Sequence, residues 1–347
     1  MKKILSICLA AAALVGCTNS DVEFDTPNEI GLVAVADNIT RNVVDGTTYP
    51  TSLNMYVYAW TNDHTSGAPN YINGGEFAHN SNNKWGGGDG TTPNPYYWPN
   101  VKTLHFAGLS KSGNVASATK SYDVANDKFT IEDYTPGTAT AVGANDLMYF
   151  PSTKTGKAEG YGKNTAAVPV TMLHTCSWIT FLVQGDDVTG AAGSTYKLTG
   201  LTVKGLDNEA TVTCTGTTVT WSDNEDVKSY TQAVTLATLG TLTKEPAVNV
   251  ENNTVYVPAN GTTGNLVFIP QVPGTLDVTY TYKSSANVEI SETVTNLSLA
   301  ISNVAADNVW EPGKHYIYTL TIKANEILVA PTVGDWDEDD DQTVTVQ

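Results

Sequence analysis

Apolar and polar positions alternate along most of this chain, and this two-residue period predicts short β-strands. In the first such segment, residues 29–36, the alternate positions Ile30, Leu32, Ala34 and Ala36 share one face. Further segments of this kind are residues 53–60, 104–108, 146–150, 168–173, 178–183, 196–203, 210–214, 218–221, 254–257, 266–269, 276–282, 288–294 and 316–322.

Turn residues (Gly, Pro and Asn) separate these segments, and the helical period of 3.6 residues is nearly absent. Short strands at this spacing are typical of β-sandwiches. The 347 residues are more than one small sandwich usually holds, so two domains are expected. We expect an all-β protein whose domains cover residues 42–165 and 166–347.

The first residues form a basic start, a short apolar run and a Leu-Val-Gly-Cys sequence that ends at Cys17. The apolar run is shorter than the roughly 20 residues that span a bilayer as a helix, so residues 1–16 are predicted to be a signal peptide. The closing sequence resembles the lipobox of bacterial lipoproteins, in which the Cys thiol is acylated. The alternative is an ordinary signal peptide that contains a cysteine.

Composition narrows the possible partners and the redox chemistry. The net charge of −18, from 36 acidic and 18 basic residues, argues against nucleic acid as a partner. Once Cys8 leaves with the signal peptide and Cys17 carries lipid, only Cys176 and Cys214 remain, too few for a disulfide framework. The two could form one bridge or stay as buried thiols.

Several segments, taken in order, resemble the fimbrillins, the pilin family of Bacteroidetes type V fimbriae. They are Tyr97-Trp98-Pro99 with Leu104 and Phe106; Val170 to Val183 around His174 and Ser177; Ile269-Pro270-Gln271; Trp310 to Leu320 with Gly313, Tyr316 and Tyr318; and Val333 with Trp336. Two positions depart from the family pattern, because Trp178 stands for a lysine and Cys176 for an alanine.

The resemblance implies two transthyretin-like Greek-key β-sandwich domains in tandem. It also implies a lipoprotein precursor that reaches the outer membrane and is cut by an Arg-specific protease. Loss of the N-terminal segment with its first strand would open a groove for a strand from a neighbouring subunit. In this chain residues 17–41 would be the tether and the removable strand.

Arg41 is the only arginine in the chain and follows the first predicted strand in a polar segment. Such segments are accessible to proteases, so we expect cleavage between Arg41 and Asn42. A lone surface arginine without this role is the alternative. We expect the removable strand to bury Ile30, Leu32, Val33 and Val35, which is worth about 6–12 kcal/mol at roughly 1.5–3 kcal/mol for each side chain.

The strand donated to a neighbour should be another alternating apolar segment. Two C-terminal segments qualify, one with Ile327 and Val329 and the other with Val344 and Val346. The alternative is that both complete the subunit's own C-terminal domain.

Other chemistry has little support in the sequence. The five histidines lack zinc-ligand spacing, and no nucleophile elbow or phosphate-binding loop is present. His174 near Cys176 fits a core histidine better than a catalytic one. The acidic run 337–341 could bind calcium but fits a solvated tail better. Aromatic residues between Trp60 and Trp98 could stack on sugars, although packing between domains suits them better.

The sequence therefore predicts a non-enzymatic, adhesive fibre subunit without a cofactor or a metal. Its expected partners are related pilins, the Arg-specific protease, the outer membrane through the lipid, and a host protein or glycan. A lipid-anchored surface protein that binds glycans or proteins and is never cut is the alternative. The sequence does not distinguish a stalk subunit from a tip subunit.

Overall fold

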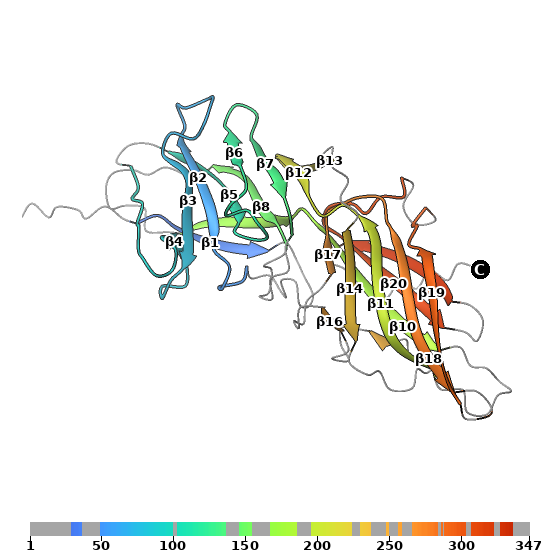
Figure 1. Ribbon diagram of the computed structural model, residues 1–347. Coiled ribbons are helices and arrows are strands. Elements are labelled where there is room, and N and C mark those ends of the chain that lie inside the picture. Colours follow the sequence, from blue (N-terminus) through green and yellow to red (C-terminus); the bar gives the residue numbers. More distant parts are fainter. Residues whose placement is uncertain are drawn as a thin grey trace, which may run out of the picture.

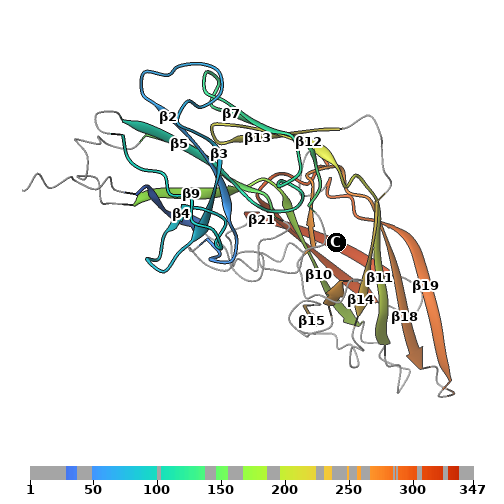
Figure 2. The same ribbon diagram turned by 60° about the vertical axis from the view of Figure 1, so that its left-hand side comes forward.

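The structure is a computed structural model of the chain. It describes residues 29–36, 49–99, 103–136, 146–154, 167–185, 196–223, 230–236, 248–249, 256–258, 266–283, 286, 288–302, 307–322 and 327–335. Within these ranges every regular element is a strand, and no helix could cross a membrane. The strands build two bodies that lie end to end (Figures 1 and 2). The all-β prediction is confirmed.

The N-terminal body is built on a closed barrel with the strand order β1-β4-β3-β2-β5-β8-β9. Its strands are β1 (Gly31–Ala36), β2 (Met55–Thr61), β3 (Ile72–His79), β4 (Trp85–Gly87), β5 (Leu104–Ser110), β8 (Met148–Lys154) and β9 (Val168–His174). Because β1 pairs with both β4 and β9, it joins the two edges of the sheet and closes the barrel.

A four-stranded sheet in the order β13-β12-β7-β6 covers one side of the barrel. Its strands are β6 (Lys120–Asp123), β7 (Lys128–Tyr134), β12 (Ala210–Thr215) and β13 (Thr218–Asp223). This cover explains the continuous apolar run of β2, which is buried along its whole length. Met55 and Val57 belong to the core inside the barrel, while Tyr56 and Tyr58 belong to the core beneath the sheet.

The C-terminal body is a sandwich of two five-stranded sheets around one apolar core. One sheet has the order β15-β10-β20-β21, and β17 also pairs with β10; the other has the order β16-β14-β11-β18-β19. The strands of the first sheet are β10 (Ser177–Gly185), β15 (Val248–Asn249), β17 (Leu266–Phe268), β20 (Lys314–Ile322) and β21 (Ile327–Asp335). Those of the second sheet are β11 (Tyr196–Leu206), β14 (Tyr230–Leu236), β16 (Tyr256–Pro258), β18 (Thr275–Lys283) and β19 (Glu289–Ser298).

An aromatic chain of hydrogen bonds anchors this sandwich. Trp310 Nε1 donates to Tyr318 Oη at 2.8 Å, and Tyr318 Oη donates to the Leu299 carbonyl at 2.8 Å. All three residues are fully buried, so each polar ring atom needs such a partner. The spacing of Trp310 and Tyr318 in the sequence thus has a direct packing reason.

The chain passes between the bodies more than once, and strand pairing crosses residue 165; the expected domain bounds stay a prediction. β9 lies beyond that residue but belongs to the barrel, and β12 pairs with β7 of the N-terminal body. The core of the N-terminal body therefore draws on Trp221, and Val267 also packs against it. The transthyretin-like topology of two tandem domains stays a prediction.

Candidate functional site

The candidate site is the place that β1 fills in the barrel wall. β1 runs parallel to β9 over five residue pairs, from Leu32–Val168 to Ala36–Met172. It pairs with β4 at only two positions, Gly31–Gly86 and Leu32–Trp85. β1 is therefore attached mainly through one neighbour, and its loss would leave β9 with a free edge.

Alternate side chains of β1, and that of Ile30, the residue before it, belong to the core inside the barrel. Ile30, Leu32, Ala34 and Ala36 are buried. Val33 and Val35 lie on the opposite face, where their side chains are 41% and 39% exposed. The expected set of buried residues was wrong for these two valines, because successive strand residues point to opposite sides of the wall. The corrected burial, two large side chains and two methyl groups, is worth about 4–8 kcal/mol.

Tyr49 completes the wall beside β1 where β4 has ended. Its backbone N–H donates to the Ala34 carbonyl at 3.4 Å, and its fully buried ring meets the edge of Trp85 at a centroid distance of 5.4 Å. The pKa of Tyr49 is raised, chiefly by burial and then by the charge of Asp146. The sequence pattern did not identify this residue, because it is a single tyrosine beside a polar segment.

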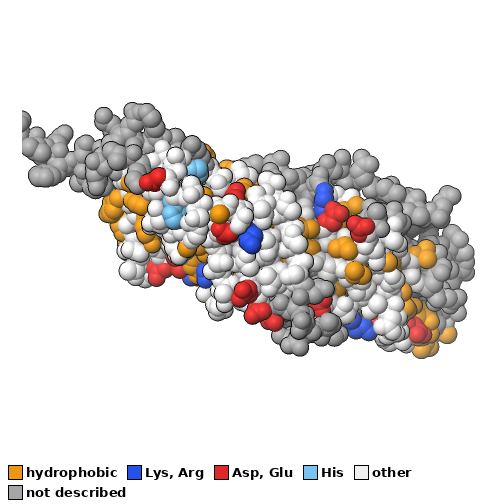
Figure 3. Space-filling view, turned by 90° about the horizontal axis from the view of Figure 1, so that it is seen from above, with side chains coloured by type: hydrophobic (Ala, Val, Ile, Leu, Met, Phe, Trp, Pro, Cys, Tyr) orange, Lys and Arg blue, Asp and Glu red, His pale blue; other side chains and the backbone are white. Residues whose placement is uncertain are grey.

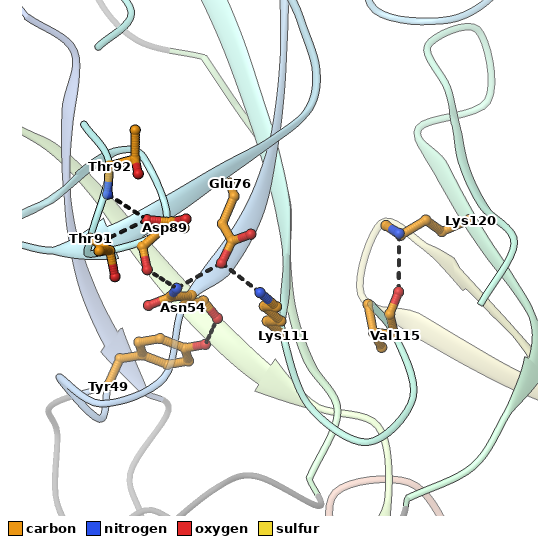
Figure 4. Close-up of polar contacts among 9 residues, drawn as sticks. All are labelled: Tyr49, Asn54, Glu76, Asp89, Thr91, Thr92, Lys111, Val115 and Lys120. Carbon is orange, nitrogen blue, oxygen red and sulfur yellow. Dashed lines mark hydrogen bonds and ion pairs between the residues drawn. The ribbon is translucent and has the colours of Figure 1, made fainter. Parts of the chain in front are cut away.

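A polar network holds the chain that follows Tyr49 (Figure 4). Tyr49 Oη donates to the Asn54 carbonyl at 3.1 Å, and Asn54 Nδ2 donates to Glu76 Oε1 at 2.7 Å and to the Asp89 carbonyl at 3.1 Å. Lys111 Nζ lies 2.7 Å from the same Glu76 oxygen, and this hydrogen bond raises the lysine pKa. Backbone N–H groups of the next turn hold the pKa of Asp89 below its usual value. The start of β2 is thereby fixed to β3 and β5.

The predicted processing residues fall outside the described ranges. These are Cys17, the whole of residues 1–28, and the pair Arg41 and Asn42. Residues 37–48 connect Ala36 with Tyr49, and both of these flanking residues are buried in the barrel core. The segment with the sole arginine therefore joins two points that the barrel holds in place.

The two candidate donor segments differ in what the structure describes. Ile327 and Val329 belong to β21, which pairs with β20 along all nine of its residues, from Lys314–Asp335 to Ile322–Ile327. Ile327 is buried and Val329 packs against the same core, so this strand completes the subunit's own sandwich. Val344 and Val346 lie outside the described residues, as does the acidic run 337–341.

The remaining chemical candidates serve packing. Cys176 and Cys214 are free thiols, both buried in the core beneath the sheet, where burial raises the thiol pKa of each. His174 is a core residue whose Nδ1 lies 2.5 Å from Asp146 Oδ2. No group of three or more potential metal ligands occurs within the described residues.

The aromatic residues between Trp60 and Trp98 also serve packing for the most part. Trp60, Trp85 and Trp98 are buried, whereas Tyr97 is 44% exposed. On the face drawn in Figure 3, acidic side chains are dispersed over both bodies. Of the four aromatic residues named here, only Tyr97 is exposed, which gives little support to a sugar-stacking platform.

The chain is similar to a protein-family model and to several solved structures. The family model described as fimbrillin-like matches residues 40–336. No curated protein matches the chain.

Among solved structures, a fimbrial protein from Bacteroides vulgatus is similar with a TM-score of 0.60 and 17% identity, over 88% of this chain and 99% of that one. A putative cell adhesion protein from Bacteroides ovatus is similar with a TM-score of 0.51 and 12% identity, over 91% of this chain and 100% of that one. At these identities the likeness concerns the fold. The match to the family model spans most of the sequence, and the chain belongs to the fimbrillin-like family.

Proposed function

We propose that this protein is a structural and adhesive subunit of a cell-surface fimbria and not an enzyme. It is delivered to the outer membrane as a lipoprotein precursor acylated at Cys17. An Arg-specific protease cuts it between Arg41 and Asn42, and residues 17–41 leave with β1. A strand of another pilin subunit then takes the place of β1.

The observation that carries this proposal is the position of β1. It closes the barrel wall between β9 and the short β4, and the segment that joins it to the rest of the barrel contains the only arginine. Two features therefore meet in one strand: a single cut would free it, and its inner face buries apolar side chains. An emptied place with a free edge would favour entry of a replacement strand. Fibre and adhesion proteins among the structural relatives agree with this role.

We propose residues 343–346, with Val344 and Val346, as the donated strand in place of β21. Removing β21 would uncover the Ile327 side chain and break a ladder of nine residue pairs. The alternative, an uncut glycan-binding lipoprotein, would need accessible aromatic side chains, and the described tryptophans named above are buried. The adhesive target is a host protein or a glycan.

The test is to produce two Arg41 variants in the native bacterium and to measure whether each is cleaved and assembled into fibres. Arg41→Ala removes the charge, and Arg41→Lys keeps it but presents the wrong residue to an Arg-specific protease. We expect both variants to accumulate as folded, lipidated precursor without fibres in electron micrographs. N-terminal sequencing of the wild-type surface protein should find Asn42 as its first residue. Normal fibres from both variants would rule out the cleavage step.

As a rescue, residues 38–43 can be replaced by the recognition sequence of another site-specific protease. Adding that protease to the purified variant should restore polymerisation. Complete cleavage with no polymers would separate processing from assembly and count against strand exchange.

A further inference from the structure

We infer that the place filled by β1 selects the incoming strand by side-chain size. In the direction of β1, the inward positions are those of residues 30, 32, 34 and 36. The first two accept large aliphatic side chains, and the last two accept nothing bulkier than alanine. This inference rests on the proposed strand exchange and specifies the partner: an extended segment of another subunit with that order of sizes.

The large half of the pattern lies at the start of β1. Leu32 sits between Val168 of β9 and Trp85 of β4 in the register, and all three side chains are buried. Ile30 precedes it on the same inner face, and its backbone N–H donates to the Tyr96 carbonyl at 2.7 Å. Small side chains here would leave a cavity that the surrounding wall can close only in part.

The small half lies beside Met172 and Tyr49, two bulky residues of the barrel core. Ala36 faces the buried Met172 across the register, and the Ala34 carbonyl accepts the N–H of Tyr49, whose large ring is fully buried. The interior of a barrel of this size is filled by side chains, so a large neighbour demands a small one. A branched side chain at position 34 or 36 would overpack this end.

Outward positions carry no such demand. Val33 and Val35 are exposed, so their replacement leaves the interior unchanged. Substitutions at these two outward positions are therefore matched controls for substitutions at the inward positions of the same strand.

The pattern separates the two C-terminal candidates. Read in the direction of β1, the inward-type positions of β21 are Ile327, Val329, Pro331 and Val333, which put a proline ring and a branched side chain at the alanine positions. Read in the opposite direction, Val329 and Ile327 fall on the alanine positions. Val344 and Val346 supply branched aliphatic side chains at the spacing of Ile30 and Leu32.

The test uses the purified precursor, which an Arg-specific protease can cut at its single arginine, and labelled synthetic strands of residues 29–36. The swap strand carries Ile30→Ala, Leu32→Ala, Ala34→Ile and Ala36→Leu and has the same composition as the wild-type strand. The control strand carries Val33→Thr and Val35→Thr. We expect the wild-type and control strands to enter the cut protein, and the swap strand to bind at least about tenfold more weakly.

The same substitutions made in the uncut precursor test the size order without any exchange. We expect the fourfold swap to lower the midpoint of urea unfolding and the double threonine variant to leave it nearly unchanged. If the swap precursor does not fold, two single variants of the precursor can be compared instead. Ala36→Val at an inward position should lower the unfolding midpoint more than Val35→Ala at an outward position.

The outcomes distinguish the two proposals. Equal stability of the swap and wild-type precursors, or equal entry of both strands, would overturn the size order. A size order that holds in the uncut chain, together with failure of every strand to enter the cut protein, would overturn strand exchange and with it this choice of partner. Entry of the wild-type and control strands without entry of the swap strand would support both strand exchange and the size order.

Discussion

His174 and Asp146 form a buried pair at the end of the barrel that faces the C-terminal body. His174 Nδ1 lies 2.5 Å from Asp146 Oδ2, and the two side chains are almost completely shielded from water. His174 ends β9, and two residues later the Cys176 carbonyl accepts the N–H of Gly313 from the C-terminal body at 2.8 Å. The pair thus fixes the point where the chain passes from one body to the other.

Breaking this pair should destabilise the protein strongly. We expect Asp146→Asn and His174→Gln each to cost about 2–4 kcal/mol of unfolding free energy, since each leaves a buried polar partner poorly satisfied. The double variant should cost less than the sum of the two, because neither partner is then left alone. Urea unfolding measures this, with Glu132→Gln at an exposed site of β7 as the control. Strictly additive losses would contradict the pairing.

Much of the fold could be predicted from the sequence because strand alternation is a local signal. Residues 29–36 and their inner face follow from the two-residue period, and the buried Trp310 and Tyr318 lie at motif positions. The closure of the barrel depends on the parallel pairing of β1 with β9, which lie more than 130 residues apart in the sequence, and no local pattern encodes it. The pairing of β12 with β7 in the N-terminal body is likewise a contact between segments distant in the sequence.

The candidate site shows the same division. Sequence composition identifies Arg41 as unique, and periodicity identifies the strand before it. Tyr49 becomes meaningful only once its N–H meets the Ala34 carbonyl. Likewise, the small size of Ala36 has no visible reason until Met172 is known to lie opposite.

His315 should make stability fall on acidification. Its ring stacks on Trp178 at a centroid distance of 3.5 Å, and burial lowers its pKa from 6.5 to about 3. Between pH 6.5 and about pH 3 the unfolded chain binds a proton at His315 that the folded chain does not. The stability is therefore present above pH 6.5 and is lost as the pH falls towards 3. We expect the wild type to lose about 1–2 kcal/mol more than His315→Asn between pH 7 and pH 5, in urea unfolding at both pH values. Parallel losses in the two proteins would contradict a neutral, half-buried His315.

Tyr49 should matter to the barrel through its ring more than through its hydroxyl. Tyr49→Phe loses only the hydrogen bond to the Asn54 carbonyl and should cost about 0.5–1.5 kcal/mol. Tyr49→Ala leaves a cavity beside Trp85 and should cost about 3–5 kcal/mol. Thermal or urea unfolding of the uncut precursor measures both, with Tyr97→Ala at an exposed site as the control. If Tyr49→Ala were as mild as the control, Tyr49 would not be the residue that completes the wall.

An engineered disulfide across β20 and β21 would test whether β21 or residues 343–346 is the donated segment. Thr319 of β20 and Ala330 of β21 are directly opposite in the register, at half-buried positions that alternate with the core-facing Tyr318 and Leu320. Opposed Cβ atoms in such a ladder lie close to the separation that a disulfide needs, so Thr319→Cys with Ala330→Cys should link the two strands. The native thiols Cys176 and Cys214 are buried and should not compete.

We expect the linked protein to form fibres as well under oxidising as under reducing conditions, because the disulfide holds β21 in its own sandwich and does not involve the proposed donor, residues 343–346. Each single cysteine variant controls for the substitutions themselves. Fibres that appear only after reduction would identify β21 as the donor instead. That result would also contradict the size order of the groove, since the groove would then have to accept Pro331 and Val333, or in the opposite direction Val329 and Ile327, where it now holds Ala34 and Ala36.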